Sequence, residues 1–192
     1  MQAEIHSQLL ESGARAFAKY GYHGTRIAAV ARDAGVGHGT FYLHFKDKQT
    51  LFREIVRISV DELLDALTEV RSRAADSEES NRREIETIVA FAESNADLLG
   101  TLATHGMKPQ DSLDRLCAQR ERELKAERKK GTLASGIDPV ILARAEVGQL
   151  LSVIQWWLEN DMHIPRQELV DSLVAIRSLW IRTPQSKPSK PS

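Results

Sequence analysis

The sequence of 192 residues contains one cysteine, Cys117, and no run of 18 consecutive apolar residues. A single cysteine excludes an internal disulfide and a CxxC metal site, and the lack of a long apolar run excludes a transmembrane helix. The N-terminal residues also lack the pattern of a signal peptide, because Glu4, His6 and Glu11 interrupt their apolar positions. These absences predict a cytoplasmic protein without a membrane partner.

Motifs for catalysis and for phosphate loops are lacking as well. The six histidines form neither HExxH nor Glu-x-x-His spacings, and no GxSxG or glycine-rich phosphate loop occurs. Cys117 lies near Arg115 and Arg120, which could lower its pKa and make it a thiol sensor, although such a cysteine is more often a small buried hydrophobe. The sequence thus predicts no enzyme, no cofactor and no metal site.

The net charge of −1 is distributed unevenly along the chain. Residues 1–60 carry eight lysines and arginines, five acidic residues and four of the six histidines. The remaining residues therefore have a net charge of −4. A basic N-terminal part favours contact with a polyanion, but an excess of three charges is weak evidence by itself.

Apolar residues recur at helical spacing along most of the chain, and strand-like alternation of any length is absent. The pattern therefore predicts an all-α fold. A first helix is expected to end at Gly21. Thr25 is expected to cap a short second helix that ends at Gly35, and a third helix follows over about 39–45.

The remainder of the chain also has a helical pattern. Asp47 is expected to cap a long helix over 47–72, followed by a polar loop at 74–80. Asn81 and Glu84 have the spacing of a capping box, and the apolar stripe that starts there continues to Leu102. Further helices are expected at about 110–130, 140–160 and 166–182, before a disordered tail at 183–192 that is rich in proline, serine and lysine.

Three helices within the first 45 residues, with a tight turn after Gly35, have the layout of a helix-turn-helix. Gly35 permits the positive φ that reverses the chain, and Val36 can fill the angle between the second and third helices. The third helix is then free to offer His38, Thr40, Leu43 and His44 to a DNA major groove. A packed three-helix bundle with a solvated basic face is the alternative.

Many fixed spacings in this part agree with one known pattern. They are GYHGT at 21–25, Ile27, VA at 30–31, AGV at 34–36, GTFY at 39–42, Phe45, Lys48 and LF at 51–52. This motif resembles the N-terminal domain of the TetR (tetracycline-repressor) family and covers about residues 9–52. The resemblance implies a helix-turn-helix domain at 1–46, and a helical ligand-binding and dimerisation domain at 47–182.

The resemblance also implies roles for individual residues. Thr25, Tyr42 and Lys48 would contact phosphates, and His38, with Thr40 and His44, would contact base edges. The complete set of expected DNA-binding residues is Thr25, Arg26, His38, Thr40, Tyr42, His44 and Lys48. The chain departs from the usual pattern at Gly37, where Ser or Thr is common, and at Ala28 and Ala29, where polar residues are frequent. These departures reduce the number of possible DNA contacts.

The last two helices each carry apolar residues on more than one face. A helix on the surface of a monomer needs only one such stripe, so the pattern favours a four-helix dimer interface between two copies. The alternative is a helix pair that is fully buried within a monomer. The candidate interface residues are Val147, Leu151, Leu158, Leu169, Leu173, Ile176 and Trp180.

A small-molecule site is expected between the N-terminal domain and these last helices. Such sites combine apolar walls with a few polar groups. The candidate lining residues are Leu98, Leu102, His105, Leu116, Arg120 and Trp156. Each of them has an ordinary alternative, namely a core position for the leucines, a helix end for His105 and a solvated surface for Arg120.

Together these features predict a homodimeric, sequence-specific transcriptional regulator. We expect a repressor that a small-molecule effector releases from double-stranded operator DNA through a shift between two conformations. Three alternatives remain open: a DNA-binding dimer without a ligand, an all-α enzyme that reuses the fold, and a helical adaptor.

Overall fold

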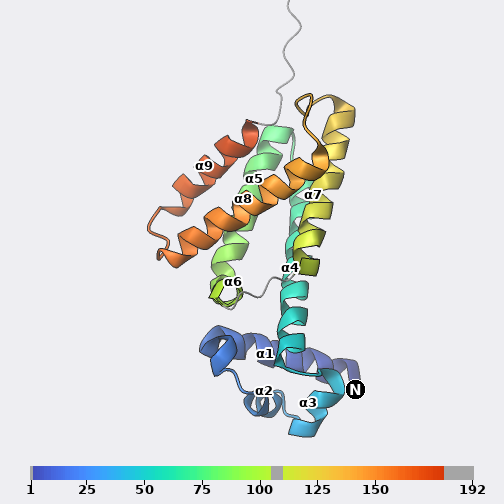
Figure 1. The fold of residues 1–192 in the computed structure, drawn as a ribbon, viewed down its shortest axis with the longest axis vertical. Coiled ribbons are helices and arrows are strands. Elements are labelled where there is room, and N and C mark those ends of the chain that lie inside the picture. Colours follow the sequence, from blue (N-terminus) through green and yellow to red (C-terminus); the bar gives the residue numbers. More distant parts are fainter. Residues whose placement is uncertain (1, 105–109, 180–192) are drawn as a thin grey trace, which may run out of the picture. The chain divides into compact units, whose positions relative to one another are not determined.

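The computed structural model describes residues 2–104 and 110–179, and nine α-helices account for most of them (Figure 1). They are α1 (Gln2–Gly24), α2 (Ile27–Asp33), α3 (His38–His44), α4 (Lys48–Arg73), α5 (Ser77–Ser94), α6 (Ala96–Thr104), α7 (Gln110–Lys130), α8 (Pro139–Glu159) and α9 (Arg166–Ser178). The all-α fold class expected from the periodicity is confirmed.

The chain divides into two compact units. Unit 1 is drawn from residues 1–65 and 90–113, and unit 2 from residues 66–89 and 114–192. The domain boundary expected between residues 46 and 47 lies just before α4, which begins at Lys48, whereas the compact units divide α4 itself. Each unit has its own apolar core.

Local signals in the sequence position the helices of unit 1. Gly21 has φ 65° and ψ 177°, which interrupts the helical backbone of α1 where the helix was expected to end. Gly35 has φ 71° and follows the end of α2, where the amide of Val36 donates to the carbonyl of Ala31 at 2.9 Å. Both glycines therefore adopt positive φ values at the turns that the sequence predicted.

The core of unit 1 packs α1, α2 and α3 against the first half of α4. Its fully buried members include Leu9, Phe17, Phe41 and Phe52. Gly13 allows α1 to approach α4 closely, because a Cβ atom at this position would lie 2.8 Å from Cδ2 of Leu51. The helix α6 also packs against α1.

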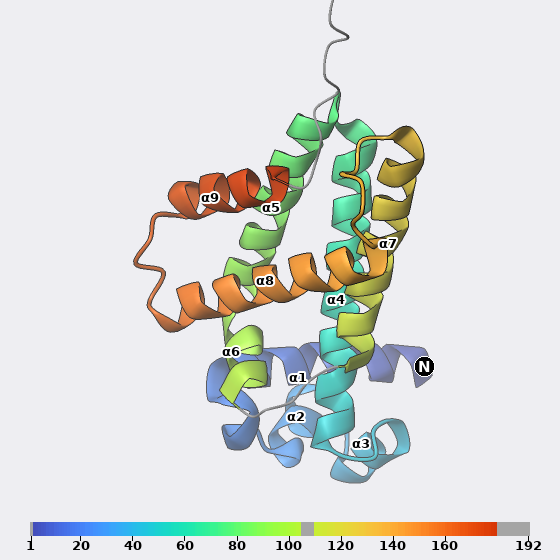
Figure 2. The same ribbon diagram turned by 45° about the horizontal axis from the view of Figure 1, so that its top comes forward.

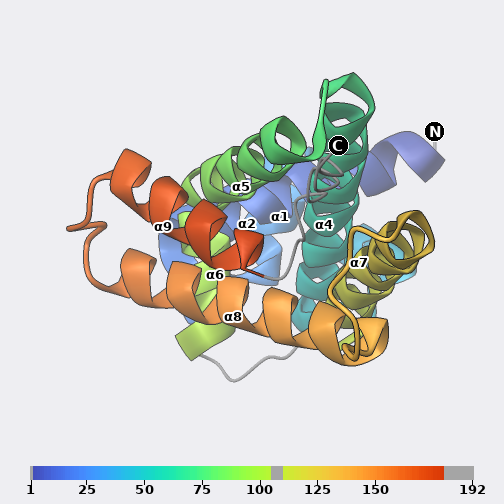
Figure 3. The ribbon, with the colours of Figure 1, turned by 90° about the horizontal axis from the view of Figure 1, so that it is seen from above.

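The main core of unit 2 brings together α5, α8 and α9, which lie side by side in Figures 2 and 3. Ile85 and Val89 of α5 pack there with Trp157 of α8 and with Leu169 and Leu173 of α9. A second, smaller cluster joins the end of α7 to the start of α8. It consists of Leu124, Leu133, Leu142 and Ala143.

Two expectations about α5 and α6 are wrong. The polar stretch at 74–80 is not all loop, because α5 begins at Ser77 and Oδ1 of Asp76 accepts the amides of Glu78 (2.9 Å) and Glu79 (2.8 Å). Asn81 is therefore a buried residue within the helix and not its cap. The single long stripe is in fact two helices, which are separated at Asn95.

Among the residues that the structure describes, none of the helices combines the length and the apolar character that a membrane crossing requires.

Candidate functional site

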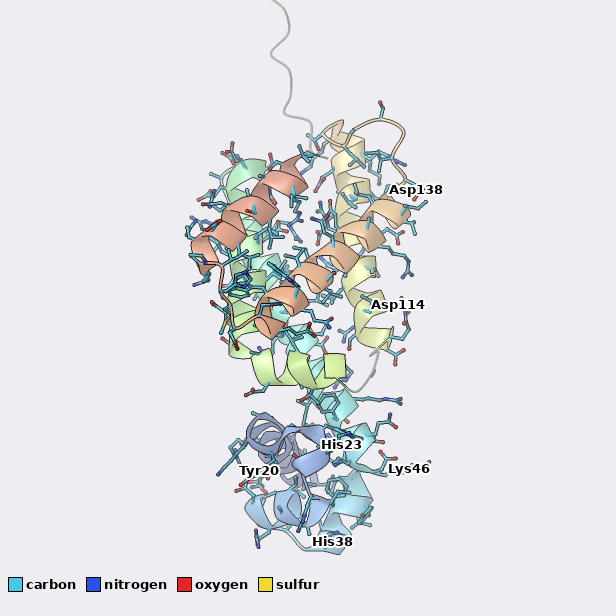
Figure 4. The ribbon with its side chains drawn as sticks, turned by 60° about the vertical axis from the view of Figure 1, so that its left-hand side comes forward. Tyr20, His23, His38, Lys46, Asp114 and Asp138 are labelled. Atoms are coloured by element: carbon cyan, nitrogen blue, oxygen red, sulfur yellow. The ribbon has the colours of Figure 1, made fainter. Side chains whose placement is uncertain are left out.

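The helix α3 has one face in the core of unit 1 and one face in solvent. Phe41 is fully buried, whereas His38 and Tyr42 are exposed, and their rings meet edge to face with centroids 5.3 Å apart. Thr40 and His44 are half-buried. His38 is labelled in Figure 4. The exposed face of α3 therefore presents one imidazole and one phenol from a rigidly packed helix.

The start of α2 differs from the sequence-based expectation. Its N-cap is Arg26 and not Thr25, and no side chain caps the helix. The hydroxyl of Thr25 is buried and donates to the carbonyls of Gly21 (2.7 Å) and Ala16 (3.0 Å) of α1. Thr25 thus fastens the end of α1, and Arg26 remains exposed beside it.

Lys48 has an intramolecular role that the sequence did not reveal. Its ammonium donates to the carbonyls of Tyr22 (2.6 Å) and Thr25 (2.9 Å), with the carbonyl of His23 at 3.4 Å. It also lies 4.6 Å from the centre of the Tyr22 ring. Burial lowers the pKa of Lys48. Lys48, the first residue of α4, therefore donates hydrogen bonds to carbonyl oxygens at the irregular end of α1.

Asp47 caps α4, as the sequence predicted. Its Oδ1 accepts the amide of Thr50 at 2.7 Å and the hydroxyl of Thr50 at 2.9 Å. These two hydrogen bonds lower the pKa of Asp47. The cap and Lys48 together determine where α4 begins.

His6 is a residue of unit 1 to which the sequence assigned no role. Its ring stacks on Phe45, which follows α3, with centroids 4.7 Å apart, and it lies 5.7 Å from the ring of His44. Its Nε2 is 3.0 Å from Oε1 of Glu54 on α4. His6 therefore holds the end of α3 between α1 and α4.

Unit 2 contains a buried network of charged residues. Its centre is Arg120 of α7, which is 7% exposed and donates through Nε to Oε2 of Glu146 on α8 at 2.5 Å. The same guanidinium donates to Glu123 (3.2 Å) and Glu127 (3.1 Å) on its own helix. The solvated alternative for Arg120 is therefore wrong, because its own helix and α8 supply carboxylates that enclose it.

The network continues from α4 to α9. Arg71 binds both carboxylate oxygens of Glu84, at 3.0 and 2.8 Å, and donates to Glu123 at 2.6 Å. Arg177 donates to Glu84 at 3.0 Å, and its Nε lies 3.7 Å from Glu146. Five helices of unit 2, namely α4, α5, α7, α8 and α9, thus contribute to one set of charge pairs.

These pairs keep Glu84 and Arg120 ionised. Burial alone would raise the pKa of Glu84, but hydrogen bonds from Arg71 and Ser80 and the charges of Arg177 and Arg71 outweigh burial and lower the pKa to about 2. For Arg120, burial acts against the charged form, and the hydrogen bond and charge of Glu146 overcome it and raise the pKa. Glu84 and Arg120 are therefore both charged at neutral pH.

The expected ligand-lining residues are divided between the two units. Leu98 and Leu102 are partly buried and pack against the core of unit 1. Leu116, Arg120 and Trp156 belong to unit 2, where Trp156 is exposed at the end of α8 with its ring 5.2 Å from that of His163. His105 lies outside the described residues. Neither unit alone contains the whole set.

The expected interface residues are likewise of two kinds. Leu169 and Leu173 are buried in the core of their own chain, with Leu158 packed partly buried against them. Val147 is half-buried, whereas Leu151 and Ile176 are exposed. Trp180 lies outside the described residues. The prediction that Leu169 and Leu173 contact a second copy is therefore corrected. Their side of α9 packs on α5 and α8 within unit 2.

Cys117 is buried, and desolvation raises the pKa of its thiol. A thiol sensor needs an accessible thiolate with a lowered pKa. The structure therefore favours the small buried hydrophobe over the sensor.

Comparisons with known proteins agree with the arrangement of unit 1. Residues 9–55 match the family model described as "Bacterial regulatory proteins, tetR family". The chain is 23% identical over 180 residues to the uncharacterized HTH-type transcriptional regulator YdgC of Bacillus subtilis (strain 168), which covers 89% of this chain and 91% of that protein. It is 24% identical to the nucleoid occlusion factor SlmA of Vibrio atlanticus (strain LGP32), over 82% of this chain and 86% of SlmA.

Solved structures share the fold. A TetR-family transcriptional regulator from Pectobacterium atrosepticum has a TM-score of 0.74 at 22% identity, covering 93% of this chain and 92% of that one. FadR from Bacillus subtilis, in complex with stearoyl-CoA, has a TM-score of 0.73 at 21% identity, covering 88% of this chain and 96% of that one. The fold and the exposed α3 define a DNA-binding transcriptional regulator of the helix-turn-helix class. Over residues 9–55, which include α2 and α3, the chain is similar to the TetR family.

Proposed function

We propose that this regulator is a repressor that binds double-stranded operator DNA as a homodimer and is released by a small molecule. The exposed face of α3 carries the proposal, because a helix that is fixed by its buried face can enter a major groove without rearrangement. His38, Thr40 and His44 would contact base edges, and Arg26 and Tyr42 would contact phosphates beside them.

Substitutions on α3 test this surface. We expect His38→Ala to lower the affinity for the operator by about fivefold or more, because a lost base contact costs about 1–3 kcal/mol. We expect Tyr42→Phe, which removes only a hydroxyl, to weaken all duplexes by about threefold to tenfold. The measurement is a titration against DNA from upstream of its own gene and against a scrambled duplex, at several salt concentrations.

The matched control is His163→Ala, which removes an exposed histidine between α8 and α9 of unit 2. This variant should bind the operator like the wild type. Unchanged binding by both α3 variants would exclude the exposed face of α3 as the contact surface.

We propose that the exposed sides of α8 and α9 form the dimer interface. Leu151 of α8 and Ile176 of α9 are exposed at 40% and 37%, and Leu179 after α9 at 77%. These apolar groups lie on the sides of the helices that face away from the core of unit 2. A second copy would cover them and would place two α3 helices on one operator, whose half-sites lie about 34–36 Å apart.

We expect Ile176→Glu to convert the dimer to a monomer, because it places a charge in an apolar interface. Sedimentation velocity would measure the oligomeric state at several concentrations. Ala118→Glu, on the exposed part of α7, adds the same charge elsewhere and should leave the dimer intact. A stable dimer of Ile176→Glu would assign the interface to another surface.

The effector would bind in unit 2 and involve Leu116, Arg120 or Trp156. A compound that raises the melting temperature of the free protein and also lowers operator affinity would be this effector. If a broad metabolite panel contains none, the ligand-independent dimer is the better assignment.

A further inference from the structure

Leu43 lies on the solvent side of α3, and the role that we infer for it rests on the proposed entry of this helix into the major groove. Leu43 is 84% exposed, which is the highest value among the large apolar side chains of the described residues. Phe41 and Phe45, on either side of it in sequence, are fully buried. Leu43 therefore takes no part in the core that holds α3 in place.

Few atoms of the protein surround the side chain of Leu43 on the side of Gly39. Gly39 precedes it by one helical turn and lies on the same face of α3. A Cβ atom at Gly39 would meet no other atom within 4 Å, so open space borders the leucine on this side. The result is an apolar side chain that projects from a helix with little around it.

The composition of α3 limits what the helix can read by hydrogen bonds. Its sequence, HGTFYLH, contains no Arg, Lys, Asn or Gln. These are the residues that form bidentate hydrogen bonds with guanine and adenine. Discrimination between bases by this helix must therefore come from single hydrogen bonds and from apolar contact.

The major groove presents one apolar group, the C5 methyl of thymine. We infer that Leu43 is a specificity-determining residue that selects thymine by covering this methyl group. Burial of one methyl group favours the thymine-containing site about fourfold over the same site without it. A lone exposed leucine elsewhere on a surface would need no such explanation, but Leu43 stands on the helix that reads DNA.

The test removes the methyl group and the leucine separately. The full-length protein first selects its operator from random duplexes, and each thymine is then replaced in turn by deoxyuridine, which lacks only the C5 methyl. At one position in each half-site, we expect the wild type to lose about fourfold in affinity. Leu43→Ala should bind the thymine and deoxyuridine duplexes equally at that position.

Met162→Ala removes an exposed apolar side chain from unit 2 and should keep the full discrimination of the wild type. Thermal unfolding should be the same for Leu43→Ala and the wild type, because Leu43 has almost no contacts to lose. Equal deoxyuridine effects in the wild type and in Leu43→Ala, or none at any thymine, would overturn the inference while leaving the proposed function intact. Failure to select any sequence would instead overturn both.

Discussion

Replacing Arg120 by methionine should lower the free energy of unfolding by about 3–5 kcal/mol. The substitution keeps much of the side-chain volume but removes the charge that lies 2.5 Å from Glu146. Glu146 is 6% exposed, and its next cation, Arg177, is 3.7 Å away. A buried carboxylate would thus lose its nearest partner while water cannot replace it. Urea unfolding followed by circular dichroism would measure the loss.

Arg122→Met is the control for this prediction. Arg122 is on the same helix, is exposed and donates to Gln119. Its loss should cost less than about 1 kcal/mol. The double variant Arg120→Met with Glu146→Gln should be less destabilised than the sum of the two single variants, because the second change removes the stranded charge. Equal stability of the Arg120 and Arg122 variants would show that the network contributes nothing to folding.

The second large effect is expected at Lys48. Lys48→Met should destabilise the protein by about 2–3 kcal/mol, because it removes charged hydrogen bonds to the carbonyls of Tyr22 and Thr25. A methionine side chain cannot donate a hydrogen bond to either carbonyl. The measurement is again urea unfolding, and Lys46→Met, two residues earlier and exposed, should have little effect. Equal stability of the two variants would contradict this role.

The same variant tests the phosphate contact that the sequence predicts for Lys48. A phosphate contact adds about 0.9 to the slope of log affinity against log salt concentration. If Lys48→Met binds operator DNA with a smaller slope, the ammonium serves both the fold and the DNA. An unchanged slope would assign Lys48 to the end of α1 alone.

The parts of the fold that depend on neighbouring residues could be predicted. Gly21 and Gly35 adopt positive φ values where turns were expected, and Asp47 caps α4 because its side chain reaches an amide three residues ahead. The spacing of apolar residues over α1 to α3 predicted a helix-turn-helix, and residues 9–55 match the TetR family model. The sequence predicted Asn81 as the cap of α5, and this was wrong, because Asp76 caps the helix.

The sequence alone determined which helices form in the DNA-binding part and which face of α3 is exposed, since helix periodicity and turn chemistry are properties of a few consecutive residues. It could not determine which neighbour an apolar or charged face meets. Only the tertiary structure placed Leu173 in the core of its own chain, turned Lys48 toward the end of α1 and enclosed Arg120 among carboxylates. Each of these results depends on contacts between residues more than 20 positions apart, and no local pattern specifies such contacts.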